Sequence, residues 1–294
     1  IYIYFLYFVF CSYSLYPQAN LLNARVPQDV GQLNEKQIES NDEDPLPYGF
    51  IDDRDVLWSK TVWELIDLDE RINFPYYYPT DTLNLGPDRR SLFHILKNNL
   101  RNGNIKEVYD DDYFQIKLTY REILDKLVSI DTLDAGFEQL NAGEALDPQY
   151  VNRRNITARE IRQYRVKGTW YFNKRQGELK YRLLGLSPVA PDVYTLDKPE
   201  AEQDLVELFW IWFPDARESL NTSTVFNTRN SSQPITYDHM LNSRRFNSII
   251  YKEENVYEDR LINEYIFEDA LQQLLESERI KNVIRDFEQD MWNN

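Results

Sequence analysis

The segment from Arg165 to Leu186 constrains the fold more than any other part of the chain, because its apolar side chains recur at every second position. Val166, Trp170 and Phe172 alternate with polar residues before a turn at 173–177, and the alternation then resumes. A period of two is typical of a strand with one buried face, and two such strands around a short turn form a hairpin. The sequence therefore predicts an antiparallel sheet.

Helical periodicity and capping signals flank this hairpin on both sides. We expect helices at Asp52–Asn73, at Ser91–Leu100, from Thr119, from Thr157, at Tyr237–Ser243, and from Leu261 onward with a break near Glu276-Ser277. We expect further strands at Ile105–Tyr109, Leu205–Phe213 and Ser248–Tyr251. The Leu205–Phe213 stretch is apolar on both parities, so it should be covered on both faces and lie centrally. The predicted fold class is α+β, with helices at both ends around an antiparallel sheet from Val166 to Phe213.

The first residues have the pattern of a secretory signal peptide. An uninterrupted apolar run, Ile1–Phe10, is followed by Ser12-Tyr13-Ser14, which resembles a small-residue cleavage site. A membrane anchor is the alternative, but a spanning helix needs about 20 apolar residues, and Pro17 follows too soon. We therefore expect a signal peptide at 1–14, cleaved near Ser14.

Composition divides the rest of the chain into three parts. Residues 15–50 are polar, acidic and punctuated by prolines, with too few apolar residues to offset the entropy of ordering, so we expect a flexible acidic arm. We expect an α+β core at 51–260 and a C-terminal helical segment at 261–294. Cleavage near Ser14 would remove Cys11, the only cysteine, and would exclude disulfides, thiolate metal sites and a cysteine nucleophile.

The charge is strongly negative overall but unevenly distributed. The net charge of −16 makes duplex nucleic acid an unsuitable partner. Residues 151–182 carry ten basic against two acidic side chains, whereas residues 253–292 carry twelve acidic against four basic. Such blocks are usually solvated faces, but they are also what complementary patches on repeating subunits require.

The sequence contains no pattern that indicates catalysis, a cofactor or a metal. His94 and His239 each lack a second histidine at ligand spacing, and isolated glycines form no phosphate-binding loop or nucleophile elbow. Asp110–Asp112 could be read as a glycosidase pair or a calcium site, but adjacent aspartates point in different directions and lack the required separation. We expect no enzyme; the alternative is a secreted carbohydrate-acting enzyme or sugar-binding module.

Two groups of residues are candidates for an interface with other proteins. Tyr76, Tyr77 and Tyr78 lie between prolines that should hold them extended, so the three rings cannot all be buried in one direction. Tyrosine is enriched at interfaces because it offers a large contact area at low entropy cost. The polar face of the hairpin carries Lys167, Lys180 and Arg182, and we expect it to be an exposed basic surface.

Long stretches of the chain resemble a known family. They are DDRDVLWSKTVWELIDLDERINFPYYYP at 52–79, DRRSLFHIL at 88–96, VYDDDYF at 108–114 and PITYDHMLNSRRFNSIIYKEENVYEDR at 234–260. In this order they resemble the family of the gliding-motility protein GldN and its secretion counterpart PorN. The resemblance covers nearly the whole of the chain expected to remain after removal of the signal peptide.

The resemblance implies a non-catalytic role in the type IX secretion and gliding machinery of Bacteroidota. It implies a periplasmic ring at the inner face of the outer membrane, built with a lipoprotein of the GldK/PorK type and by self-association. It also implies contact with an inner-membrane-anchored motor component of the GldM/PorM type. The resemblance transfers no catalytic or binding residue. The charge blocks would then bring an acidic surface of one subunit against a basic surface of the next.

Overall fold

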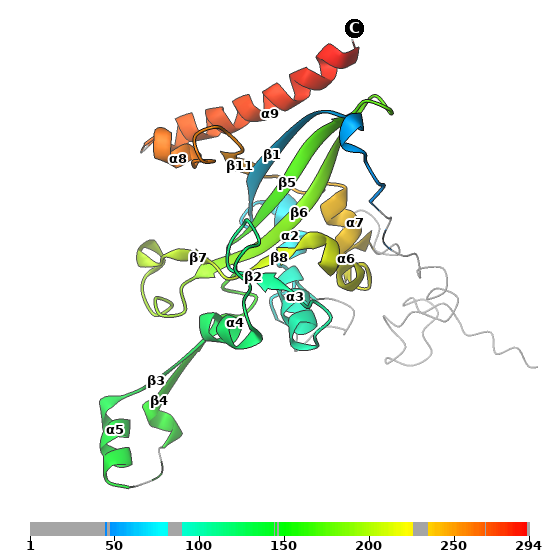
Figure 1. The fold of residues 1–294 in the computed structure, drawn as a ribbon. Coiled ribbons are helices and arrows are strands. Elements are labelled where there is room, and N and C mark those ends of the chain that lie inside the picture. The colour runs from blue at the N-terminus through cyan, green and yellow to red at the C-terminus, as the bar shows by residue number, and fades with distance from the viewer. Residues whose placement is uncertain are drawn as a thin grey trace, which may run out of the picture.

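The computed structural model describes residues 45, 48–81, 90–143, 145, 147–225, 235–267 and 269–292. The signal peptide predicted at 1–14, and all of the arm predicted at 15–50 except residues 45 and 48–50, lie outside these ranges. The fold is built on an antiparallel seven-stranded sheet in the order β11-β1-β5-β6-β8-β2, with β7 pairing with β6 off this path (Figure 1). Its strands are β1 Val56–Asp67, β2 Val108–Tyr109, β5 Gln163–Asn173, β6 Glu178–Pro191, β7 Leu205–Glu207, β8 Trp210–Trp212 and β11 Ile249–Glu253.

The predicted hairpin is confirmed and forms the middle of the sheet. β5 pairs with β6 from Gln163 opposite Val189 to Asn173 opposite Glu178. The connecting turn contains Gly177 in the left-handed region, with φ 67°, which a glycine adopts without the penalty of a Cβ. The α+β fold class is also confirmed, because helices pack on this antiparallel sheet.

The helix predicted at Asp52–Asn73 is wrong, because most of this segment forms the long strand β1. β1 lies between β11 and β5, and its middle residues Val62, Trp63 and Glu64 are all buried. Burial of consecutive residues hides the period of two that normally identifies a strand. The β-branched and aromatic content of the segment was the remaining signal for a strand.

The helices lie around the sheet and between its strands. Their bounds are α2 Phe74–Tyr77, α3 Leu92–Arg101, α4 Tyr120–Leu127, α5 Asp134–Asn141, α6 Phe213–Asn221, α7 Tyr237–Asn242, α8 Ile262–Tyr265 and α9 Ala270–Trp292. Short 3₁₀ helices occur at Asp53–Asp55, Arg71–Asn73, Pro148–Tyr150 and Glu200–Glu202. The helices predicted at Ser91–Leu100, from Thr119 and at Tyr237–Ser243 are therefore confirmed.

Two capping boxes have different outcomes. At Thr119 the hydroxyl accepts from the Glu122 amide, the Glu122 carboxylate accepts from the Thr119 amide, and α4 follows. At Thr157 the Glu160 carboxylate likewise accepts from the Thr157 amide, at 2.7 Å, but only a turn forms. The helix predicted there is wrong, because β5 begins at Gln163 and leaves no length for one.

The other predicted strands differ mainly in length. The Ile105–Tyr109 strand shortens to β2, and the Ser248–Tyr251 strand is confirmed as β11. The Leu205–Phe213 stretch is buried as expected only from Leu208 onward, since Leu205 is 43% exposed. It forms two short strands, of which β8 lies between β6 and β2. Its last residue, Phe213, begins α6.

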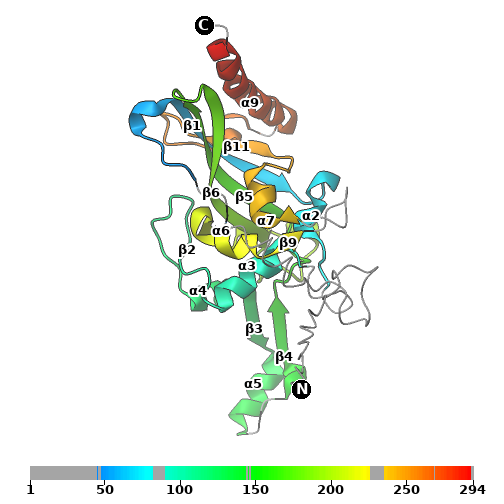
Figure 2. The same cartoon turned by 90° about the vertical axis from the view of Figure 1, so that its right-hand side faces the viewer.

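The main core lies between the sheet and the helices α2, α3, α6 and α7. Its members include Leu92 and Leu96 from α3, Phe213 from α6 and Tyr237 from α7, each with 0% exposure. Figure 2 shows these helices gathered around the lower part of the sheet, while α9 lies apart from them at its upper end.

The C-terminal helix α9 packs on the sheet from Ser277 onward. Ile280 and Ile284 share a small core with Val62 and Ile250, and the Ser277 hydroxyl accepts a hydrogen bond from the Ile250 amide at 2.8 Å. The predicted break near Glu276-Ser277 is wrong, because α9 is continuous from Ala270 to Trp292. The apolar residues before the predicted break, Leu271, Leu274 and Leu275, need not line up with Ile280 and Ile284, since only the latter two pack on the core.

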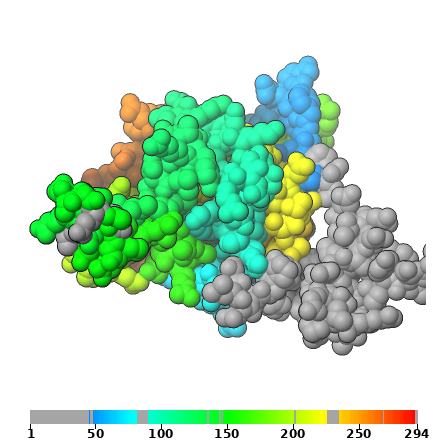
Figure 3. Space-filling view, turned by 90° about the horizontal axis from the view of Figure 1, so that it is seen from below, coloured from blue at the N-terminus to red at the C-terminus, as the bar shows by residue number. Residues whose placement is uncertain are grey.

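A separate extension projects from the body. It consists of β3 Val128–Thr132 and β4 Val151–Asn155, which pair only with each other, and of α5 and a 3₁₀ turn between them. Figures 1 and 2 both show it extending away from the sheet, and Figure 3 shows it as a distinct green lobe. We call residues 128–155 the projecting arm. A third small sheet, β9 Thr224–Val225 with β10 Ile235–Thr236, flanks residues 226–234.

Candidate interaction surfaces

Each of the three aspartates after β2 has a structural partner. Asp110 forms an ion pair with Lys126 of α4. Asp111 accepts hydrogen bonds from three of the following backbone amides and so holds the loop in shape. Asp112 Oδ2 lies 2.8 Å from the Lys252 Nζ atom. Each of the three carboxylates is thus bound by a different structural partner.

The loop is clamped to the sheet by two lysines and two aromatic rings. Lys167 Nζ and Lys252 Nζ lie 4.6 and 4.3 Å from the centroid of the Trp63 ring. Tyr113 covers both ammonium groups from the loop, at 4.5 and 4.6 Å. Lys167 Nζ also donates to the Asp112 carbonyl at 2.9 Å. Such cation–π contacts are strongest where the cation is shielded from water.

The pKa values of Lys167 and Lys252 are shifted in opposite directions. Burial lowers the pKa of Lys167, although the Asp112 carboxylate opposes that shift. For Lys252, burial also disfavours the charged form, but hydrogen bonds to Asp112 and Tyr113 outweigh it and raise the pKa. The loop therefore places a fixed negative charge against two cations.

The hairpin face that the sequence identified is only partly exposed. Lys180 pairs with Tyr171 and Arg182 with Thr169, and Lys167 lies two residues from Thr169 on β5, so all three cations share one face. Lys167 is nevertheless only 9% exposed, because the loop after β2 folds over it. The expectation that Lys167 lies on an exposed surface is therefore wrong, whereas Lys180 and Arg182 remain partly exposed. An interface role for these cations stays a prediction.

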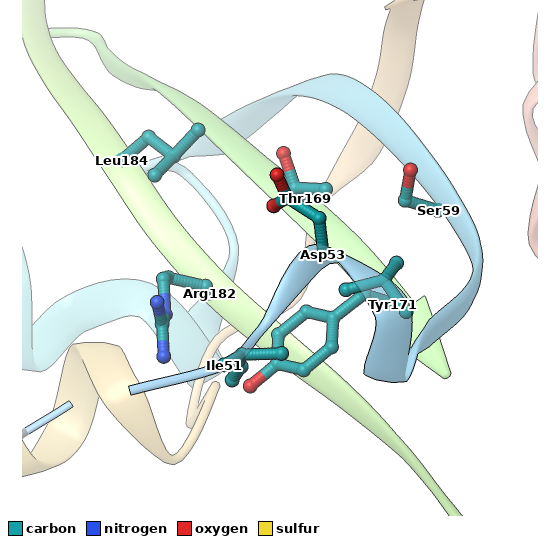
Figure 4. A pocket seen from close by; sticks show the side chains of 8 residues that line it. Ile51, Asp53, Ser59, Thr169, Tyr171, Arg182 and Leu184 are labelled. Carbon is teal, nitrogen blue, oxygen red and sulfur yellow. The ribbon is translucent and has the colours of Figure 1, made fainter. Parts of the chain in front are cut away.

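Arg182 lines a hollow of about 460 Å³ on the uncovered part of this face. Figure 4 shows Arg182 and Tyr171 projecting from neighbouring strands toward Ile51, with Asp53 on the same side. The Arg182 guanidinium donates to the Gly49 carbonyl at 3.0 Å and lies 4.8 Å from the Tyr48 ring centroid. The lining combines the charged side chains of Asp53 and Arg182 with the hydroxyl groups of Ser59, Thr169 and Tyr171.

Tyr48 is held where the chain approaches the core. Its hydroxyl donates to Asn242 Oδ1 at 2.7 Å, and its ring lies 4.3 Å from the Arg217 guanidinium. Arg217 in turn forms a buried bidentate pair with Asp238, at 2.8 and 3.0 Å. Burial raises the pKa of Tyr48 to about 12, although the positive charge of Arg217 acts against it.

The three consecutive tyrosines have three different environments. The prediction that they are extended is wrong for Tyr76 and Tyr77, which belong to α2, whereas Tyr78 is extended. Tyr76 is fully buried, and Tyr78 is 53% exposed. The Tyr77 hydroxyl donates to the Arg159 carbonyl at 3.0 Å. The expectation that the three rings cannot all be buried together is thus confirmed, and a partner for Tyr78 stays a prediction.

The aromatic cluster around Tyr78 adjoins a set of arginines that sequence reasoning did not connect to it. Phe74 packs edge-on against Tyr78, with ring centroids 5.5 Å apart, and Ile72, two positions before Phe74 in the chain, is 58% exposed. Arg154, Arg159 and Arg162 line a cleft of about 360 Å³ together with Glu160 and Asp197, and the Arg159 carbonyl accepts the hydrogen bond from Tyr77. The sequence alone could not identify this surface, because only the fold brings α2 close to arginines about eighty positions away.

Two other exposed apolar surfaces were also not predicted as such. One lies on the projecting arm, where four large side chains are between 48% and 61% exposed: Ile130, Leu133, Phe137 and Leu140. The other lies at the beginning of α9 and at Phe267 just before it. Its four large side chains are between 42% and 75% exposed: Phe267, Leu271, Leu274 and Leu275. The helical spacing of both sets is visible in the sequence, but it normally indicates a core-facing stripe.

The described residues offer little basis for other kinds of site. Among them, no group of three or more His, Cys, Asp or Glu side chains is arranged to hold a metal ion. Within the same ranges, no helix combines the length and apolar character that crossing a membrane requires. His94 and His239 lie in α3 and α7, and each ring has an amide or guanidinium neighbour, consistent with a structural position.

Comparison with known proteins identifies the family. A search of curated protein sequences returned no match. The model of the family described as gliding motility associated protein GldN, which is not a known enzyme family, matches residues 51–293. This match spans the whole sheet, the projecting arm and α9, and it agrees with the resemblance seen in the sequence motifs. The chain therefore belongs to the GldN family, whose members are components of the gliding motility and type IX secretion machinery.

Proposed function

We propose that the chain is a non-catalytic structural subunit of the periplasmic ring of this machinery, held at the inner face of the outer membrane. Family membership supports a role in gliding and secretion. The use of Asp110–Asp112 in structural ion pairs and turns supports a role without catalysis. The proposed partners are a ring lipoprotein of the GldK/PorK type, a motor component of the GldM/PorM type, and further copies of the chain.

The projecting arm is the observation that carries the proposal of an assembly role. Its two strands pair only with each other, and a two-stranded ribbon is marginally stable in water by itself. It nevertheless exposes Leu133, Phe137 and Leu140 along one side of α5. Exposed apolar side chains gathered on a protruding element are typical of a surface that a partner covers. We propose that the lipoprotein covers this arm.

Shortening the arm tests this role without disturbing the body. Ile130 and Arg153 are opposite each other in the ribbon, so Asn-Gly can replace residues 131–152 and close the strands with a tight turn. The shortened chain should unfold at nearly the same temperature as the full chain, because the main core contains no residue of the deleted segment. It should no longer co-isolate with the envelope ring particle.

Point substitutions provide the matched comparison. Phe137→Gln should reduce recovery in the particle, whereas Glu138→Gln, at the neighbouring position on α5, should not. Undiminished recovery of both the shortened chain and Phe137→Gln would contradict the proposed role of the arm.

The alternative of a carbohydrate-acting enzyme makes the opposite predictions. An enzyme would act as a small soluble species, and substitution of Asp110 or Asp112 would abolish turnover. A structural subunit would lose only stability in those variants, because Asp110 and Asp112 hold Lys126 and Lys252. Turnover of a glycoside by the isolated chain, lost on Asp112→Asn, would contradict the structural proposal.

A further inference from the structure

One arginine side chain ties the projecting arm to the body near the base of the arm. Arg154, near the end of β4, is only 15% exposed, and it forms an ion pair with Asp131 of β3 inside the arm. Its guanidinium also lies 3.3 Å from the Asp197 carboxylate and donates to the Tyr194 carbonyl at 3.2 Å, and both of these residues belong to the body. In the part of the chain that the structure describes, no other side chain of the arm forms an ion pair with the body.

The alternation of the ribbon places Arg154 on the face that is turned toward the body. Arg154 is opposite Ser129, and Asp131 lies two positions further along β3, so these three side chains share one face. Ser129 is only 4% exposed. On the other face Ile130 is opposite Arg153, and Ile130 is 61% exposed. The Arg154 guanidinium therefore leaves the ribbon on its covered side.

The loop that Arg154 contacts is itself held by the core. Both body residues that it contacts belong to the β6–β7 loop, residues 192–204, beside which the arm leaves the body (Figure 1). Val193 of this loop is 2% exposed and is a member of the main core. The Asp192 amide donates to the Asp204 carbonyl at 2.9 Å and so joins the two ends of the loop. The contact of Arg154 is therefore a contact with a fixed part of the body.

A two-stranded ribbon needs such a contact to keep its direction. β3 and β4 pair only with each other, so no neighbouring strand stiffens them. Their hydrogen bonds lie in the plane of the ribbon and therefore oppose bending out of that plane only weakly. The base is fixed, because Val128 packs against the main core and the Ile156 amide donates to the Leu127 carbonyl at 2.8 Å. Beyond the base, the direction of the arm depends on Arg154.

We propose that Arg154 is a positioning residue that locks the projecting arm in one direction relative to the sheet and so presents the apolar side of α5 for binding. A surface that is already held in its binding direction loses less conformational entropy when a partner covers it. The role of Arg154 rests on the proposed function, in which a partner covers the arm. If release of the arm leaves the binding direction populated for about one-tenth of the time, the apparent affinity falls about tenfold.

Distances between two spin labels in the full chain test the lock. In a Cys11→Ser background, Glu138→Cys places one label on α5 of the arm, and Arg101→Cys places the other at the end of α3. Both positions are exposed. Without further substitution, the labelled chain should give a narrow distance distribution. Arg154→Met keeps most of the length of the side chain but removes its charge and hydrogen bonds, so it should widen the distribution.

Each side of the lock has a matched control. Arg153→Met should leave the distribution narrow, because the Arg153 Nε donates to Asn155 within the arm, at 3.2 Å. On the body side, Asp197→Lys places a like charge against Arg154 and should release the arm; Asp197 is 63% exposed, so this variant should fold. Glu200→Lys on the same loop should not release the arm, because Glu200 pairs with Arg162 outside the arm.

Recovery in the envelope ring particle links the lock to assembly. Arg154→Met and Asp197→Lys should each be recovered about tenfold less than the wild type. The proposal would be overturned by a broad distribution in the labelled chain without further substitution, or by narrow ones in both variants. A control released as much as its matched variant, or full recovery of the variants with a released arm, would overturn it as well.

The chain shortened at residues 131–152 separates this role of Arg154 from the function on which it rests. If the shortened chain is lost from the particle while Arg154→Met keeps a narrow distribution, the arm has its assembly role and only the lock is wrong. If the shortened chain is recovered as well as the full chain, the assembly role of the arm is wrong, whatever the distances show.

Discussion

The Arg244 guanidinium donates two hydrogen bonds to the Glu64 carboxylate, at 2.8 and 2.9 Å, in the interior next to the middle of β1. Glu64 is 1% exposed, and the Arg244 guanidinium also lies against two neighbouring rings, 4.2 Å from the Tyr181 centroid and 5.1 Å from the Trp170 centroid. A buried pair of this kind links the strand to the segment between α7 and β11. Its loss should therefore affect the whole fold.

We expect Arg244→Met to lower the free energy of unfolding by about 3–5 kcal/mol, because it leaves the Glu64 carboxylate buried without a partner. Chemical denaturation with matched slopes measures this change. The double variant Glu64→Leu with Arg244→Met should recover part of the loss, since no unpaired charge remains. Arg54→Ala, which breaks the exposed Asp52 pair, is the control and should leave the midpoint unchanged. Equal midpoints for Arg244→Met and Arg54→Ala would show that the buried pair contributes nothing.

A second prediction concerns Gly168 in the middle of β5. A Cβ atom at this position would lie 2.1 Å from the Tyr181 hydroxyl oxygen, and the Tyr181 ring is itself in contact with Trp170 and Arg244. Gly168→Ala should therefore cost about 1–3 kcal/mol of stability through overpacking. Gly49→Ala is the matched control, because nothing lies within 4 Å of its Cβ position. Thermal unfolding of both variants checks the comparison; a Gly168→Ala melting temperature equal to that of the control would contradict the clash.

Elements whose contacts are close together in the sequence could be predicted, whereas elements that depend on distant partners could not. The β5–β6 hairpin was predicted because its two strands are adjacent and its turn is local. The strand β1 was mistaken for a helix because its partners β11 and β5 lie far along the chain, and burial on both sides removes the alternation. The continuity of α9 was missed because the apolar residues up to Leu275 and those from Ile280 onward do not line up on one straight helix, and the first group proves to face solvent.

For the surfaces, too, the sequence predicted local features but not contacts between distant residues. The sequence identified Tyr78, Lys180 and Arg182 as interface candidates, and all three are at least partly exposed. It could not show that the loop after β2 covers Lys167, because the contact joins residues more than fifty positions apart. Nor could it bring the tyrosines beside Arg159, since only the fold makes that contact.

The pH dependence of stability should contain a contribution from His94. Partial burial lowers the pKa of His94, and the positive charges of Arg90 and Lys97 lower it further. If the Asn98 amide donates to His94 Nε2, at 2.8 Å, protonation of the ring removes this hydrogen bond as well. The folded state therefore binds fewer protons than the unfolded state, whose histidine titrates near 6.5.

Because folding lowers the pKa of His94, the contribution of neutral His94 to stability is fully present above about pH 6.5. This contribution is lost as the pH falls toward the lowered pKa of the folded state. As the pH falls below 7, we expect the free energy of unfolding of the wild type to decrease more than that of His94→Gln. Denaturation at each pH measures this difference. Lys97→Gln should raise the NMR titration midpoint of His94 by removing one positive neighbour. Identical pH profiles for the wild type and His94→Gln would contradict this assignment.

The final prediction concerns the attachment of α9. Phe287 stacks on Trp58 with centroids 4.7 Å apart and an angle of 18° between the rings, and it meets Phe172 edge-on at 5.9 Å. Removing the ring should cost at least about 0.5–1.5 kcal/mol beyond the loss of buried area. Phe287→Ala should therefore accelerate amide hydrogen exchange in the last turns of α9, while exchange in β5 and β6 stays slow. Leu271→Ala, on the outward side of the same helix, should leave exchange throughout α9 unchanged in the isolated chain, because Leu271 is 64% exposed. Faster exchange in the Leu271→Ala variant, or none in Phe287→Ala, would mean that the helix is held by its first half.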